Sequence, residues 1–67
     1  MNWIPVEEAL PIPGERVLAY DVALKQAIAL YYMRHGNNIR FEQWLYGHCY
    51  VMENVTHWMH LPQPPEK

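Results

Sequence analysis

The chain has 67 residues, a formal net charge of −2 and a single cysteine. This length suits one domain near the lower limit for folding without disulfides or a bound metal, and one cysteine excludes an internal disulfide. The charge gives no basic surface for nucleic acid. The sequence also lacks the pattern of a signal peptide and the roughly 20 consecutive apolar residues of a membrane span. We therefore expect one small soluble domain in a reducing cytoplasm, without a membrane partner.

The N-terminal third is punctuated by prolines, each of which fixes φ and removes a main-chain donor. The stretch between Pro5 and Pro11 has room for about one helical turn and for no long helix or central strand. Pro13 and Gly14 form a typical turn pair. The alternating sequence RVLAYD, residues 16–21, then predicts a strand.

The segment 22–34 is compatible with two structures. As a helix it would begin at Asp21, a good N-cap, and end near Gly36. As a strand it would follow a bend over 21–25 and run through QAIALYYMR, whose aromatic and branched residues suit a sheet. Local preferences do not separate the two, and both remain open at this point.

The sequence HGNN, residues 35–38, favours a hairpin turn because glycine and asparagine tolerate positive φ. The following segment, 39–46, alternates as a half-buried strand, and a hairpin would favour the strand for 26–33. Residues 47–54 are expected to be irregular or partly extended. VTHWMHL, residues 55–61, alternates again before prolines stop further pairing.

These patterns predict a mainly β fold: a small antiparallel sheet or open barrel of three to five strands, with at most one short helix. Residues 1–62 form the single domain, and 63–67 form a short proline-rich tail. The tail could also act as a polyproline II ligand, although it lacks the usual basic flank.

Both ends of the chain resemble a known family. The sequences WIPVEEALPIPGERVLAYD and VTHWMHLPQPP cover roughly residues 3–21 and 54–65. They are similar to the starts and ends of the family catalogued as domain of unknown function 551, which run much like W-I-P-V-x-E-x-L-P-x-x-G-x-x-V-L-V-Y and V-T-H-W-M-P-L-P-x-P-P. The resemblance implies a strand-rich protein of phages and prophages, carried among small accessory genes, and supplies no catalytic residues. His60 replaces the usual proline, so a shared activity cannot depend on it.

Four side chains of zinc-binding type lie near the C-terminus: His48, Cys49, His57 and His60. On a strand, His57 and His60 point to opposite faces, and no C-x-x-C pair accompanies them. We expect a packed His57, surface positions for His48 and His60, and no metal or other cofactor.

A Cys49–His48 nucleophile pair would need an orienting group and an oxyanion hole, for which so short a chain has little room. We therefore expect that the protein is not an enzyme.

The aromatic residues fall into two predicted groups. Trp3, Pro5 and Trp58 belong to the two recognisable ends, so the simplest expectation is a structural cluster in which the ends meet. One face of a small sheet suffices for a core, so other rings are left over. These are predicted to form an exposed aromatic patch of Tyr31, Trp44, Tyr46 and Tyr50.

The aromatic patch and the family's setting predict binding to a host or phage protein in the bacterial cytoplasm. The alternative is capture of a small nucleotide-like ligand, as a counter-defence protein would do; single-stranded nucleic acid is disfavoured by the charge. Because an isolated small sheet is marginal and leaves open edges, we also expect a homodimer, through an edge or aromatic face within 39–46.

Overall fold

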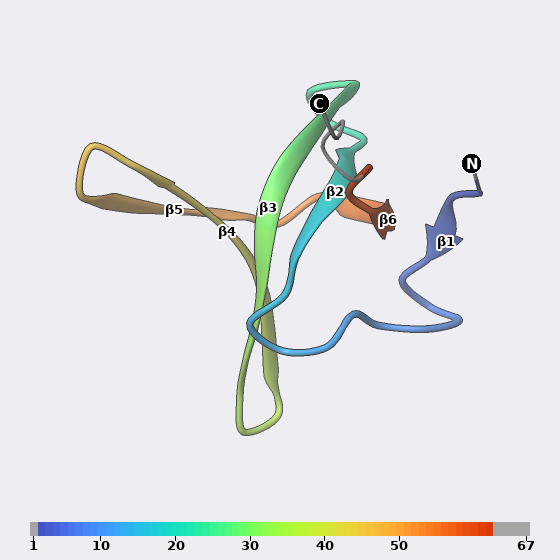
Figure 1. Cartoon of the computed structure of the whole chain (residues 1–67), viewed down its shortest axis with the longest axis horizontal. Helices are drawn as coiled ribbons and strands as arrows, with labels where there is room; N and C mark the ends of the chain where they lie inside the picture. Colours follow the sequence, from blue (N-terminus) through green and yellow to red (C-terminus); the bar gives the residue numbers. More distant parts are fainter. Residues whose placement is uncertain (1, 63–67) are drawn as a thin grey trace, which may run out of the picture.

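The computed structural model describes residues 2–62, which form one open antiparallel sheet and no helix (Figure 1). The strands are β1 (Ile4–Pro5), β2 (Arg16–Asp21), β3 (Gln26–His35), β4 (Asn38–Leu45), β5 (His48–Met52) and β6 (Val55–His60). Their order in the sheet is β1-β6-β2-β3-β4-β5. Strands β2 to β5 form a meander, and β6 returns to pair with β2 and with the N-terminal β1.

The expected fold class is confirmed as mainly β and antiparallel, but the expected count of three to five strands is wrong, because the described residues form six. The two strands outside the four segments that the sequence pattern favoured as strands are β1 and β5. Strand β1 has only two residues and includes Pro5. Strand β5 lies in the segment that we expected to be irregular or partly extended, and its pairing with β4 makes it extended. The proline-rich tail at 63–67 lies outside the described residues.

The segment 22–34 adopts the strand alternative. Asp21 caps a tight turn instead of a helix, since its Oδ1 accepts a hydrogen bond from the main-chain N–H of Leu24 at 2.9 Å. Lys25 closes the turn with φ of 55°. Strand β3 then pairs with β2 on one side and β4 on the other, and this tertiary pairing decides between the two structures that local preferences left open.

Two-residue turns join β3 to β4 and β4 to β5. Gly36 takes φ of 62° between β3 and β4, at the position where a type II′ turn requires glycine. Between β4 and β5, Tyr46 and Gly47 both have positive φ, at 52° and 78°, as in a type I′ turn. HGNN was therefore correctly predicted as a turn, whereas the second turn carries a tyrosine where asparagine or glycine is usual.

The core lies on one face of the sheet. Residues directly opposite each other in a ladder share a face, so the register places six buried side chains together: Val17, Ala19, Leu30, Tyr32, Phe41 and Trp58. The loop 6–14 packs against this face through Val6 and through the Trp58 indole N–H, which donates to the Ala9 carbonyl at 2.9 Å. This hydrogen bond joins residues that lie 49 positions apart in the sequence, and it holds the proline-rich loop over the core.

In the middle of strand β4, buried and exposed residues do not alternate. Phe41 and Glu42 are consecutive yet both buried, on opposite faces of the sheet. Beyond them the β4–β5 hairpin extends away from the other strands (Figure 1, ochre). Because β4 has a partner on each side, it offers no free edge, so the expected contact of two copies within 39–46 could use only its aromatic face. A homodimer remains a prediction.

Candidate binding surface

The face of the sheet opposite the core, which we call the open face, still carries apolar and aromatic side chains. The register places Leu18, Tyr31, Trp44 and Val51 on it. Tyr31 is 39% exposed and Trp44 is 56% exposed. An antiparallel sheet with one solvated face normally presents polar residues there, so exposed aromatic rings indicate a contact surface.

Tyr31 and Trp44 form the centre of the open face. Tyr31 lies directly opposite Glu42, and Trp44 follows two positions along β4, so the two rings are diagonal neighbours. The guanidinium carbon of Arg16 lies 5.8 Å from the centre of the Tyr31 ring, within cation–π range. Arg40 pairs its Nε with the Glu42 carboxylate at 3.3 Å. We call these five residues the Arg–aromatic patch.

Glu42 is the buried charged residue of this patch. Its side chain is only 5% exposed, although it points to the solvated side of the sheet. Burying a carboxylate is costly unless it is paired, and the Arg40 contact meets this requirement. The pair therefore holds Arg40 in a defined position on the open face, diagonal to Tyr31 in the register.

Cys49 borders the patch, directly opposite Trp44. Desolvation and, after it, the Glu42 carboxylate raise the pKa of the Cys49 thiol above its usual value. A raised pKa lowers the thiolate fraction, so this thiol is a poor nucleophile at neutral pH. His48 lies on the opposite face, where its ring centre is 6.4 Å from that of Tyr50. The sequence neighbours His48 and Cys49 therefore do not converge on one reacting atom.

The four aromatic residues predicted as one patch are divided by the fold. Tyr31 and Trp44 share the open face. Tyr46 occupies the tip of the β4–β5 hairpin and is 97% exposed. Tyr50 is 49% exposed but lies opposite Gln43, on the core side of the sheet. The contiguous surface is therefore Tyr31 and Trp44 with nearby arginines.

The two ends of the chain meet, because β1 pairs with β6 and brings Ile4 opposite Trp58. The predicted cluster of Trp3, Pro5 and Trp58 does not form as one unit. Trp58 belongs to the core, whereas the Trp3 ring packs edge-on against Tyr20 at 6.2 Å on the open face. Trp3, Tyr20 and His57 line a shallow pocket of about 280 Å³.

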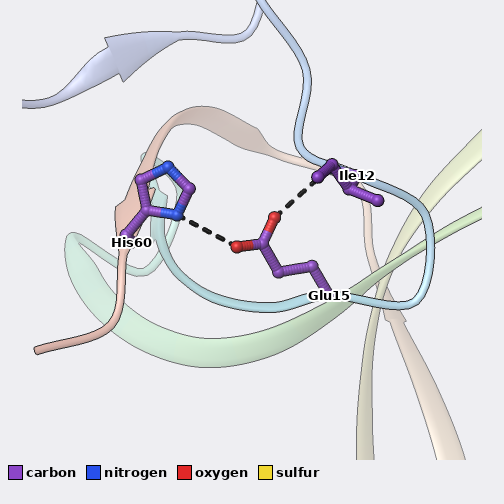
Figure 2. A network of polar contacts seen from close by, with 3 residues as sticks. All are labelled: Ile12, Glu15 and His60. Carbon is purple, nitrogen blue, oxygen red and sulfur yellow. Dashed lines mark hydrogen bonds and ion pairs between the residues drawn. The ribbon is translucent and has the colours of Figure 1, made fainter. Parts of the chain in front are cut away.

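The histidines are dispersed. His57 lies opposite Tyr20 and its Nδ1 is 2.9 Å from the Thr56 hydroxyl. His60 lies opposite Val17, on the other face, and its Nδ1 is 3.0 Å from the Glu15 carboxylate, which also accepts from the Ile12 N–H (Figure 2). Among residues 2–62 no three metal-binding side chains gather, and no helix is long and apolar enough to cross a membrane.

Sequence reasoning missed the polar part of the open face. The predicted patch did not include Arg16, Arg40 or Glu42. The i, i+2 spacing of Arg40 and Glu42 on a strand was a usable signal, since such residues share a face. The Trp3–Tyr20–His57 pocket had no such signal, because its three residues come from separate segments of the chain.

The comparisons with known proteins agree with the resemblance of the two ends. The family model described as "Protein of unknown function (DUF551)" matches residues 2–66. The chain is 37% identical over 71 aligned positions to the "Uncharacterized 7.8 kDa protein in ral-gp17 intergenic region" of Salmonella phage P22, with 100% of each chain covered. No solved structure matches it. The chain therefore belongs to the DUF551 family of proteins of unknown function, and one of its relatives is a phage protein.

Proposed function

We propose that this protein is a phage or prophage accessory protein that acts by binding a host or phage protein through its open face. The observation that carries the proposal is the Arg–aromatic patch, in which exposed Tyr31 and Trp44 share a face with Arg16, which contacts the Tyr31 ring, and with Arg40, which pairs with Glu42. The phage relative supports the setting, and the bacterial host cytoplasm is the compartment we propose.

The composition of the patch favours a protein partner. Tyrosine, tryptophan and arginine are the residues that most often dominate binding energy at protein interfaces, because large rigid rings bury much area at little entropic cost. The patch is also partly preorganised, since the Tyr31 ring and the Arg40 head group already have partners within the chain. Less ordering entropy is then lost on binding.

A catalytic role is not part of the proposal. The one candidate nucleophile, Cys49, has a raised thiol pKa and no converging histidine. The buried Glu42 already serves Arg40 as an ion-pair partner. These features favour a binding surface over a reacting centre.

Affinity capture from a bacterial lysate tests the proposal, with wild type compared with a Tyr31→Ala/Trp44→Ala double variant. The matched control is Tyr50→Ala, which removes a ring of similar exposure from the opposite face. We expect wild type and the control to retain the same proteins and the double variant to lose them. Calorimetry with a purified captured protein should then show an affinity loss of at least about tenfold for the double variant, corresponding to hot-spot residues. Equal capture by all three, with folding verified by circular dichroism, would remove the open face from consideration.

A second candidate function is supported by the Trp3–Tyr20–His57 pocket. Its size and aromatic lining suit a flat ring such as a nucleobase. No lysine or arginine among residues 2–62 lines it, so we expect a nucleoside to bind as well as its phosphorylated form. A thermal-shift comparison of nucleosides with nucleotides, repeated on Trp3→Ala, decides this point: no stabilisation of wild type by any of them would end the ligand hypothesis.

A further inference from the structure

The two edges of the sheet differ in their protection against pairing with another strand. One edge is β1, which has two residues, one of them Pro5. Very short strands and prolines are the usual devices that block edge pairing. The other edge is β5, with five residues of sequence HCYVM. It contains no proline and no formally charged side chain, so β5 is the unprotected edge.

The register shows which main-chain groups β5 presents outward. A two-residue turn makes its flanking residues, Leu45 and His48, a hydrogen-bonded pair, and bonded positions alternate from there. His48, Tyr50 and Met52 therefore direct their N–H and C=O groups toward β4. The corresponding groups of Cys49 and Val51 point away from the sheet, and no other described strand pairs with them.

We propose that a second copy of this chain pairs antiparallel with β5, about a twofold axis that passes beside Tyr50. In this register Tyr50 lies opposite Tyr50 of the second copy, and Cys49 of each chain lies opposite Val51 of the other. The outward groups of Cys49 and Val51 then form four main-chain hydrogen bonds across the axis. The two sheets join into one.

Strand β5 is complementary to itself in this register, and for this reason the proposed pairing partner is a second copy of the chain. A twofold axis perpendicular to the sheet keeps core-side residues beside core-side residues, so both cores remain on the same face. No like charges are brought opposite each other, since the nearest charged residue, Glu53, would face Gly47 of the second copy. A foreign strand would have to supply this match by chance.

The β4–β5 hairpin, which we call the β4–β5 arm, is also the part of the sheet that such pairing would stabilise most. The arm extends from the sheet, and β5 pairs with β4 alone (Figure 1). A two-stranded hairpin is marginal in water, and independent stability requires three or more strands with a hydrophobic face. Pairing of two arms would produce a four-stranded segment. The proposal does not rest on the proposed function, because the contact uses the strand edge and leaves Tyr31 and Trp44 exposed.

The first test measures mass by light scattering from micromolar to millimolar concentration. We expect wild type to reach twice the 8.0 kDa of the single chain. Val51→Pro removes an outward N–H that has no partner within the chain, so it should keep the fold and weaken the dimer about 30-fold or more, given two lost bonds. Val51→Thr is the matched control and should dimerise normally. A wild type that remains at 8.0 kDa throughout, or a folded Val51→Pro that dimerises normally, overturns the proposal.

The second test does not depend on how well the proline variant folds. In a Cys49→Ser/Tyr50→Cys variant, two cysteines would face each other at a non-hydrogen-bonded pair, where Cα atoms are about 4.5 Å apart and a disulfide can form. Mild oxidation should link most of this variant and little of the wild type, whose Cys49 faces Val51. Linking of the wild type in preference to the variant would refute the register.

Discussion

Tyr46 offers a clean test of how backbone conformation limits the stability of this fold. It occupies the first position of the type I′ turn with φ of 52°, a region in which an L side chain is strained by roughly 1–2 kcal/mol. Its side chain is 97% exposed, so replacing it costs almost no buried area. Tyr46→Asn creates an Asn-Gly pair, the sequence that this turn prefers.

We expect Tyr46→Asn to stabilise the protein by about 0.5–1 kcal/mol, somewhat less than the full strain because asparagine also carries a β-carbon. For a domain of this size that corresponds to a rise in Tm of about 3–6 °C. The measurement is thermal unfolding followed by circular dichroism at one low concentration, since self-association would add concentration-dependent stability.

Tyr46→Ala is the matched control, because it removes the ring but keeps the strained β-carbon. Its Tm should stay within about 2 °C of wild type, as exposed substitutions usually do. If asparagine and alanine give the same Tm, backbone strain at the turn is not what limits stability, and the reasoning fails. A lower Tm for both would mean that the tyrosine ring makes a stabilising contact despite its exposure.

Three further predictions concern the core, its turn and the thiol. Asp21→Ala should cost about 1–2 kcal/mol in urea unfolding, because a main-chain N–H loses its acceptor, whereas Asp21→Asn should cost clearly less; equal losses would contradict the assigned bond. Trp58→Phe should lower stability by about 1–3 kcal/mol through lost volume and the lost bond to Ala9, and should speed hydrogen exchange in the loop over the core. Unchanged exchange would show that Trp58 does not anchor this loop. The pKa of Cys49 is raised, so its thiolate forms only at higher pH than usual; Glu42→Gln should lower that pKa and speed alkylation at mildly alkaline pH, and a slower reaction would reverse the assigned sign.

The sequence alone determined those parts of the fold that depend on neighbouring residues. The alternation in RVLAYD gave β2 with the same bounds as in the structure. The glycine and asparagines of HGNN gave the β3–β4 turn, because few residue types accept positive φ. The two end motifs identified the family. In the segment 22–34 the local preferences for helix and strand were evenly balanced, and only the neighbouring hairpin turn and the family resemblance favoured the strand.

Tertiary structure decided everything that depends on which strands become neighbours. Strand β1 exists because β6 lies beside it, and β5 exists because β4 does. The same pairing put Trp58 in the core and Trp3 on the open face, although both belong to recognisable end motifs. It also separated Tyr50 from Trp44 by sending them to opposite faces.

The candidate site follows the same division. Exposed aromatic residues could be predicted from their number, since a sheet this small cannot bury them all. Which of them share a surface with Arg16 and Arg40 could not, because the face of each residue depends on strand register and the middle of β4 buries consecutive residues. Register is fixed by the cooperative packing of the whole sheet against one core, and a shift of one residue would reverse every face.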